Sequence, residues 1–209
     1  MKVFAFLLVL LLGGAGCARI YRPVAVAASP ARTPGPQLSG HAEPQPWGDN
    51  SRYEERAQTA RLKVLALTLE NTASGDVEIL TVEVPAATEA LSPEAALKLV
   101  KQWPAAYASY VVVPAVAVAL SSGYEGVAYA GLGVVGLLIA IPNAMVASHS
   151  NDRLESFFRA RAWSPGVLHA GETWRGLLFL RTPEPAPPLS LRIHYRAGGD
   201  EHHLDLPGP

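Results

Sequence analysis

The pattern of hydrophobic and polar positions predicts two β-strands in the first half of the chain. Residues 61–70 carry apolar side chains at both even and odd positions, so both faces of an extended segment would be apolar. This is typical of a central strand that is covered on both sides. Residues 77–84 are rich in branched side chains and precede Pro85, which predicts a second strand. Residues 71–76 have a turn-forming composition, so we expect the two strands to form a hairpin.

The C-terminal residues predict another hairpin, with a defined register. Gly198 and Gly199 fit the centre of a two-residue turn, in which both positions need a positive φ. The strands would then pair Leu191 with Leu206, Arg192 with Asp205, Ile193 with Leu204, His194 with His203, Tyr195 with His202 and Arg196 with Glu201. This register gives one apolar face and one face of opposed charges, and a slip by one residue would destroy both patterns. Residues 174–181 predict a further strand, and residues 164–166 and 170–172 bracket short extended pieces.

The middle of the chain is apolar without the alternation of a strand. Ser92 and Pro93 are an N-cap residue and a first-turn proline, which predict a helix with Trp103 on its apolar side and an interruption at Pro104. From residue 102 to residue 151, Glu125 is the only Asp, Glu, Lys or Arg. We therefore expect residues 105–120 and 126–141 to form the arms of a helical hairpin.

These apolar arms need an environment that covers them. They could pack against the sheets, meet copies of themselves in an oligomer, or enter a bilayer. A single spanning helix over residues 127–146 and a strand over residues 111–120 are alternatives. Gly131, Gly133 and Gly136 favour close approach of two backbones over a dinucleotide-binding loop, because no acidic ribose ligand follows at the expected distance. A last helix, capped by Ser150 or Asn151, should lead back to the strands.

Together these elements predict a mainly β fold, an antiparallel Ig-like β-sandwich with an apolar, Gly- and Ala-rich helical insertion at about residues 92–162. We expect five or six strands within a domain that covers residues 52–209, and a helix-covered sheet is the alternative. Residues 17–51 contain repeated prolines among small and polar residues, which predicts an extended tether.

Composition excludes several classes of protein. The formal net charge is -1, so we expect no basic surface for nucleic acid. The single cysteine, Cys17, allows neither an internal disulfide nor a cysteine-based metal site. The G-x-S-x-G pattern of a nucleophile elbow does not occur in the sequence. We therefore expect a protein that is not an enzyme, has no catalytic residues and needs no cofactor.

The N-terminus has the order of a secretory signal peptide. Lys2 supplies a positive charge, residues 3–12 are apolar, and four small residues lead to Cys17. The apolar run is too short to span a bilayer, which favours a cleaved leader over a permanent anchor. Residues 1–17 resemble the lipobox of bacterial lipoproteins. That resemblance implies removal of residues 1–16 and lipidation of Cys17, and Ala18 in place of Asp implies sorting to the outer membrane, on its periplasmic face.

The predicted hairpin register also places His194 opposite His203, beside Glu201 and Asp205. Two imidazoles and a carboxylate can bind a divalent metal, but no third ligand is fixed by spacing. We therefore favour a solvated histidine pair and no metal site.

Two functions fit the sequence. The first is a cell-envelope lipoprotein that is held to the membrane by its N-terminal lipid and binds or scaffolds envelope proteins or copies of itself. The alternative is a membrane-inserting or oligomer-forming envelope component that acts through the apolar residues 105–147.

Overall fold

The computed structural model describes residues 17–27, 32–85, 88–108, 124–185 and 189–208. The elements, in chain order, are β1 (Leu38–Pro44), α2 (Ser51–Thr59), β2 (Leu62–Asn71), β3 (Val77–Glu83), β4 (Glu89–Leu91), α3 (Pro93–Val100), the 3₁₀ helix η1 (Pro104–Ala108), α5 (Tyr124–Arg161), β5 (Gly166–Leu168), β6 (Thr173–Arg181), β7 (Ser190–Ala197) and β8 (Asp200–Pro207). The chain divides into two compact units. The helical unit comprises Met1–Arg22 and Lys101–Arg153, and the two-sheet unit comprises Pro23–Val100 and Leu154–Pro209.

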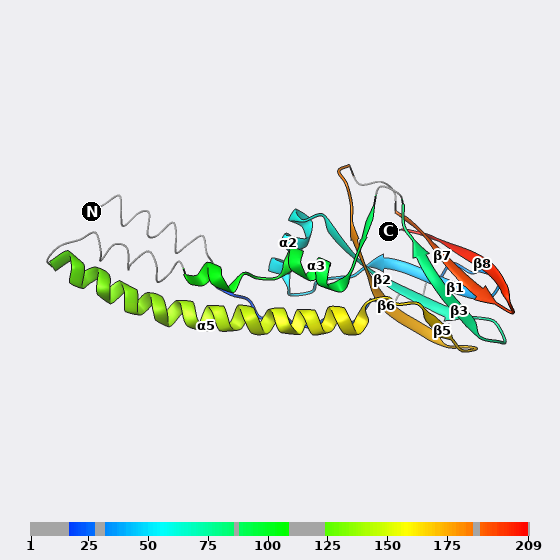
Figure 1. Cartoon of the computed structure of the whole chain (residues 1–209), viewed down its shortest axis with the longest axis horizontal. Helices are drawn as coiled ribbons and strands as arrows, with labels where there is room; N and C mark the ends of the chain where they lie inside the picture. The colour runs from blue at the N-terminus through cyan, green and yellow to red at the C-terminus, as the bar shows by residue number, and fades with distance from the viewer. Residues whose placement is uncertain (1–16, 28–31, 86–87, 109–123, 186–188, 209) are drawn as a thin grey trace. The chain divides into compact units, whose positions relative to one another are not determined.

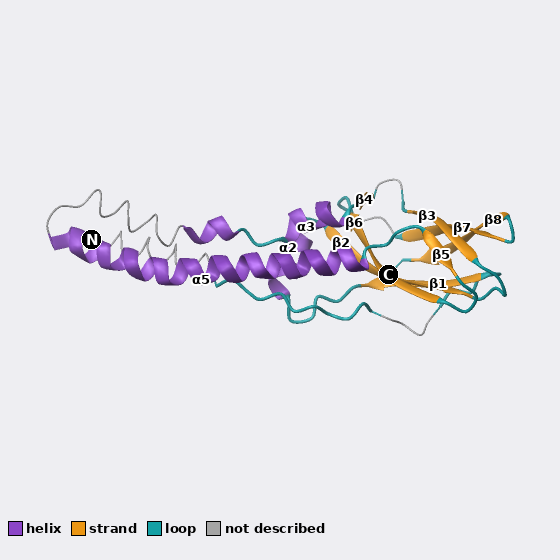
Figure 2. Cartoon of the chain, turned by 60° about the horizontal axis from the view of Figure 1, so that its bottom comes forward, coloured by secondary structure: helices purple, strands orange, loops and turns teal. Residues whose placement is uncertain are grey.

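The two-sheet unit is mainly β, with two four-stranded antiparallel sheets (Figures 1 and 2). One sheet has the order β1-β2-β6-β4 and the other the order β5-β3-β7-β8. Every neighbouring pair is antiparallel. The described residues thus contain eight strands rather than five or six, because β1 and the short β4 add to those expected from the sequence.

Both sheets contribute side chains to one hydrophobic core. The core includes Leu65, Leu67, Leu69 and Leu180 from the first sheet, and Ile79, Ile193, Tyr195 and Leu204 from the second. β2 is buried on both faces, which confirms it as a covered central strand. Beyond the shared core, α2 packs against β2, and the Phe158 ring near the C-terminal end of α5 lies 4.6 Å from the Phe179 ring of β6.

The predicted C-terminal hairpin is confirmed in every pair, from Leu191 with Leu206 to Arg196 with Glu201. Gly198 and Gly199 both have a positive φ, at 62° and 95°. β5 and β6 confirm the short extended piece and the strand expected before this hairpin.

The predicted hairpin between residues 61–70 and 77–84 is wrong, because β2 and β3 belong to different sheets. Asn71 lies at the crossing and is only 1% exposed. Its Nδ2 donates to the carbonyl oxygens of Gly75 and Leu168, and its Oδ1 accepts a hydrogen bond from the N–H of Ala73. These bonds join the turn to Leu168 of β5 in the other sheet, so residues 71–76 form a corner between sheets.

The expectation of an extended tether over residues 17–51 needs correction, because β1 lies inside this range. β1 pairs with β2 along its whole length, from Leu38 opposite Asn71 to Pro44 opposite Leu65. Leu38, Gly40 and Ala42 alternate inward, and a Cβ at Gly40 would lie only 2.9 Å from the Leu69 side chain. The prolines flank this strand or end it, so they do not interrupt its hydrogen bonds.

α5 also corrects the sequence prediction, because one helix of 38 residues replaces the second arm and the separate last helix. Pro142 lies inside it, and neither Ser150 nor Asn151 is an N-cap. Both residues are instead in the helix interior, and Ser150 is buried. Residues 105–108 of the first arm belong to η1, while its remainder and the alternative strand at residues 111–120 lie outside the described residues.

The helix predicted at Ser92 is confirmed as α3. The Ser92 Oγ accepts a hydrogen bond from the N–H of Ala95 at 3.1 Å, as an N-cap should. The helix ends at Val100, and Trp103, expected on its apolar side, is 69% exposed. Within the described parts of the chain, no helix is both long and apolar enough to cross a membrane.

Candidate functional site

Cys17, the residue expected to carry lipid, is exposed in the helical unit. The residues that follow it are held by side-chain amides from distant parts of the sequence. The N–H of Ala18 donates to the Oδ1 of Asn143 at 2.7 Å. The side-chain amide of Gln102 makes two hydrogen bonds with the backbone of Arg19. Its Nε2 donates to the Arg19 carbonyl oxygen at 2.7 Å, and its Oε1 accepts from the Arg19 N–H at 3.3 Å. Cys17 therefore occupies a defined place on this unit and is not at the start of a free tether.

The amides that hold this segment are themselves fixed. Gln102 is 1% exposed, and its backbone N–H and carbonyl are bonded by the Oδ1 and Nδ2 of Asn151, each at 2.8 Å. The Nδ2 of Asn143 donates to the Ile139 carbonyl one helical turn earlier. Because buried amides are costly unless they are bonded, this network stabilises one arrangement of the Cys17 segment. Sequence reasoning missed Gln102 and Asn143 and gave Asn151 a capping role, although polar amides within so apolar a stretch were a usable signal.

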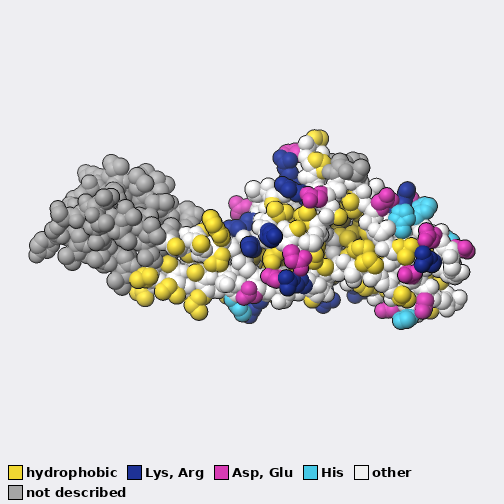
Figure 3. All heavy atoms as spheres, viewed as in Figure 1, with side chains coloured by type: hydrophobic (Ala, Val, Ile, Leu, Met, Phe, Trp, Pro, Cys, Tyr) yellow, Lys and Arg dark blue, Asp and Glu magenta, His cyan; other side chains and the backbone are white. Residues whose placement is uncertain are grey.

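The part of α5 beside Cys17 has an unusual distribution of side-chain sizes. Small residues are buried, namely Gly136, Ala140, Ala147 and Ser150. Large apolar residues are exposed, namely Leu137, Leu138, Ile139, Ile141 and Met145. Figure 3 shows hydrophobic side chains gathered on the described part of α5. This part of the helix thus turns its large apolar side chains outward.

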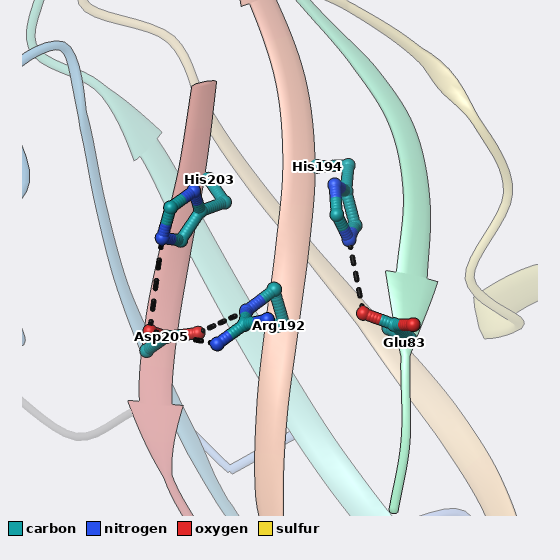
Figure 4. Close-up of polar contacts among 5 residues, drawn as sticks. All are labelled: Glu83, Arg192, His194, His203 and Asp205. Atoms are coloured by element: carbon teal, nitrogen blue, oxygen red, sulfur yellow. Dashed lines mark hydrogen bonds and ion pairs between the residues drawn. The ribbon is translucent and has the colours of Figure 1, made fainter. Parts of the chain in front are cut away.

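The second candidate lies on the outer face of the β5-β3-β7-β8 sheet, where the register of β7 and β8 brings charged residues together (Figure 4). The Nε of Arg192 donates to the Oδ1 of Asp205 at 2.7 Å, and Arg196 contacts Glu78 and Glu201 at 2.9 and 3.0 Å. The bond from Arg192 holds the pKa of the Asp205 carboxyl below its usual value. A cavity of about 410 Å³ beside this pair is lined in part by Glu83 and Pro85.

The two histidines of this face do not converge on one point. His194 points toward Glu83 of β3, with 3.1 Å between its Nε2 and the carboxylate, while the Nε2 of His203 lies 3.9 Å from Asp205 on its own strand (Figure 4). In the part of the chain that the structure describes, no group of three or more His, Cys, Asp or Glu residues could hold a metal ion. The arrangement is one of separate pairwise contacts between a histidine and a carboxylate, which suits a solvated surface.

No protein-family model, no curated protein and no solved structure matches this chain.

Proposed function

We propose that this chain is a bacterial cell-envelope lipoprotein, anchored through lipid on Cys17 to the periplasmic face of the outer membrane. The observation that carries the proposal is the setting of Cys17. The residue is exposed, follows a signal-like leader, and is followed by residues fixed by Asn143 and Gln102. A modifying enzyme could reach such a thiol, and acyl chains attached there would extend from a defined position.

The two-sheet unit then acts as a non-enzymatic binding or scaffolding module, with an Ig-like sandwich arrangement. Two four-stranded sheets around one core support this reading, because such a scaffold presents broad faces and loops to partners. The outer face of β7 and β8 is charged, and its cavity beside Arg192 and Asp205 offers a contact surface with both charged and apolar side chains. Its partner would be another envelope protein or a second copy of the chain.

The anchor is tested by metabolic labelling with a radioactive fatty acid in a Gram-negative host. The native chain should incorporate label, lose residues 1–16 and sediment with the outer membrane. Cys17→Ser should incorporate no label and keep its leader, whereas Ala18→Ser, which keeps the thiol, should be labelled like the native chain. An unlabelled native chain, or a mature N-terminus without acyl groups, would refute the proposal.

A second candidate function is favoured by the exposed apolar residues of α5. Under this alternative, residues 105–147 insert into a membrane or assemble with other copies. The five large apolar side chains exposed on the described part of α5 support it, because such a surface is normally covered. Chemical cross-linking of the membrane-bound chain tests for assembly, and a purely monomeric pattern would speak against it.

A further inference from the structure

Four of the exposed apolar side chains of α5 form one face over two turns of helix. Leu138, Ile141 and Met145 are spaced three and four residues apart, so they lie in one row. They are 71%, 55% and 67% exposed. Leu137 borders this row and is also exposed. We call Leu137, Leu138, Ile141 and Met145 the apolar face of α5.

The opposite side of the same turns buries small side chains, and its half-buried positions are Asn143, Ala144 and Val146. Ala140 and Ala147 are packed with Tyr107 and with the partly buried Ala18 and Ala144. A helix in water places its large apolar residues inward and its polar residues outward. A helix in lipid uses small residues where helices meet, because lipid can solvate the large apolar side chains. The distribution of side-chain sizes on this part of α5 is that of a helix in lipid.

The apolar face ends abruptly in the direction of the C-terminus. Met145 is followed, one turn further along the same side, by His149, and then by Asp152 and Arg153, all exposed. One helical turn is only about 5.4 Å, so the outward surface changes from apolar to polar over a distance comparable with the interfacial layer of a bilayer.

Cys17 lies at the level of this change. The N–H of Ala18 is bonded to Asn143, which is two residues from both Ile141 and Met145 along the helix. Acyl chains on Cys17 would therefore begin at the same level along the helix as the end of the apolar face, on the side where Ala140 and Ala147 are buried. The two features lie in the same unit, so this placement does not depend on the position of the sheets.

We propose that the apolar face of α5 is immersed in the hydrocarbon of the leaflet that receives the acyl chains of Cys17, with the headgroup level between Met145 and His149. This inference rests on the proposed lipidation of Cys17. Lipid is favoured over a protein partner because residues 126–151 contain no Asp, Glu, Lys or Arg that could form the polar rim of a protein interface. The anchor also holds this face beside a bilayer permanently, which gives lipid a high effective concentration there.

The single cysteine provides a sensitive test, because lipidation converts its thiol to a thioether. Each cysteine added to the full-length lipoprotein then becomes its only free thiol. Leu138→Cys and Met145→Cys probe the apolar face, and Asp152→Cys is the matched control on the same helix. The purified lipoproteins are inserted into the outer leaflet of phosphatidylethanolamine and phosphatidylglycerol vesicles and treated with a charged, water-soluble maleimide.

We expect Leu138→Cys and Met145→Cys to react at least about tenfold more slowly than Asp152→Cys, because the reagent is excluded from hydrocarbon and a thiol there does not ionise. All three should react equally after SDS is added. A bimane label at residue 138 should also be quenched by nitroxide-labelled lipid more strongly than one at residue 152. All three sites are exposed surface positions, so the substitutions should leave the fold intact.

Equal reaction rates at residues 138, 145 and 152 in vesicles would overturn the inference. So would protection without nitroxide quenching, or a disulfide between copies of Leu138→Cys, since either shows that protein covers the face. Reaction of the native chain itself with maleimide would show that Cys17 is not lipidated. That result contradicts the proposed function and is distinct from failure of the bilayer contact.

Discussion

The side chain of Asn71 makes three hydrogen bonds to backbone groups where the chain crosses between the two sheets. It ends β2, is almost fully buried, and bonds the backbone of Ala73, Gly75 and Leu168. Its amide can both donate and accept, so it joins a turn to a strand of the other sheet. An aliphatic residue would leave those backbone groups without a partner in the interior.

We predict that Asn71→Ala lowers the free energy of unfolding by about 2 to 4 kcal/mol, because it removes several buried hydrogen bonds at once. Ser74→Ala, at an exposed position of the same corner, should change it by less than about 0.5 kcal/mol. Urea denaturation followed by tryptophan fluorescence measures both. Equal midpoints for the two variants would show that the Asn71 bonds contribute little.

The pair of His169 and Asp76 gives the two-sheet unit a pH dependence. The Nδ1 of His169 lies 3.1 Å from the Asp76 carboxylate, and this hydrogen bond is the main cause that raises the pKa of His169, with the Asp76 charge second. A raised pKa in the folded state means that protonation stabilises the fold. The contribution is present below the unfolded-state pKa of about 6.5 and is lost as the pH rises through the higher folded-state value.

The free energy of unfolding of the native chain should therefore fall slightly between pH 6 and pH 8.5. That of His169→Gln should fall less over the same range. The range is chosen to span the usual histidine pKa of about 6.5 and the raised value above it. The effect is small because both side chains are largely exposed. Urea midpoints of the native chain and the variant at the two pH values give the comparison. An identical pH dependence in both would remove His169 as its source.

At the scale of elements, the β7–β8 hairpin depends on its turn. Both central residues have a positive φ, a conformation that suits glycine or asparagine at the first position and strains a branched residue. A Cβ at Gly198 would meet no atom within 4 Å, so backbone conformation and not crowding decides which residues fit.

We predict that Gly198→Asn leaves the stability of the two-sheet unit within about 0.5 kcal/mol of the native value, whereas Gly198→Val lowers it by about 2 kcal/mol. Thermal unfolding followed by circular dichroism separates the two. If both substitutions were equally harmful, contacts of the turn and not its φ angles would have to be responsible.

The sequence predicted this hairpin correctly because its information is local. Charges and apolar residues face each other across a single turn, so one register satisfies all pairs. The partners of β2 could not be obtained in the same way. Its apolar faces specify burial, but β1 and β6 as its neighbours are determined by packing over long sequence separations. β1 was not predicted because the segment around it is rich in proline. Proline is compatible with a strand when it flanks or ends the hydrogen-bonded ladder, and the sequence alone does not show where the ladder lies.

The same distinction applies to α5 and to the lipidation site. Ser150 and Asn151 as capping residues suggested a separate last helix, but helix propensity is a weak guide where packing and side-chain bonds act, as Asn143 and Asn151 do here. Cys17 could be identified from the leader alone. Its fixed setting could not, because Gln102 and Asn143 lie far from it in the sequence.

At the scale of the whole molecule, the two units differ in the kind of core that they possess. The two-sheet unit buries leucine, isoleucine and tyrosine between its sheets. In the described part of the helical unit, the buried cluster consists of Tyr107, Ala140 and Ala147. Alanines remove little apolar area from water, so this cluster stabilises weakly. The larger apolar side chains on the described part of α5 in that unit face outward, and lipid would bury them.

If this is correct, the chain is held to the membrane by two attachments, and the weaker one can be measured once the lipid is removed. A Cys17→Ser chain exported with a conventional cleavable leader has no acyl chains. It should still bind vesicles through the apolar face of α5, whereas addition of Leu138→Gln and Met145→Gln should release it. These two side chains are 71% and 67% exposed, and moving them into hydrocarbon contributes about 2 to 4 kcal/mol together, or about 30-fold to 1000-fold in partition coefficient.

Vesicle flotation at several lipid concentrations gives that ratio directly. His149→Gln with Asp152→Asn is the matched control, because it changes two exposed polar side chains beyond the proposed headgroup level and should shift the partition coefficient by less than about threefold. A greater loss in this control than in the Leu138 and Met145 variant would mean that polar contacts, and not hydrocarbon, hold the helical unit to the membrane. The opposite order would assign the second attachment to the apolar face and explain why so many large side chains of α5 point outward.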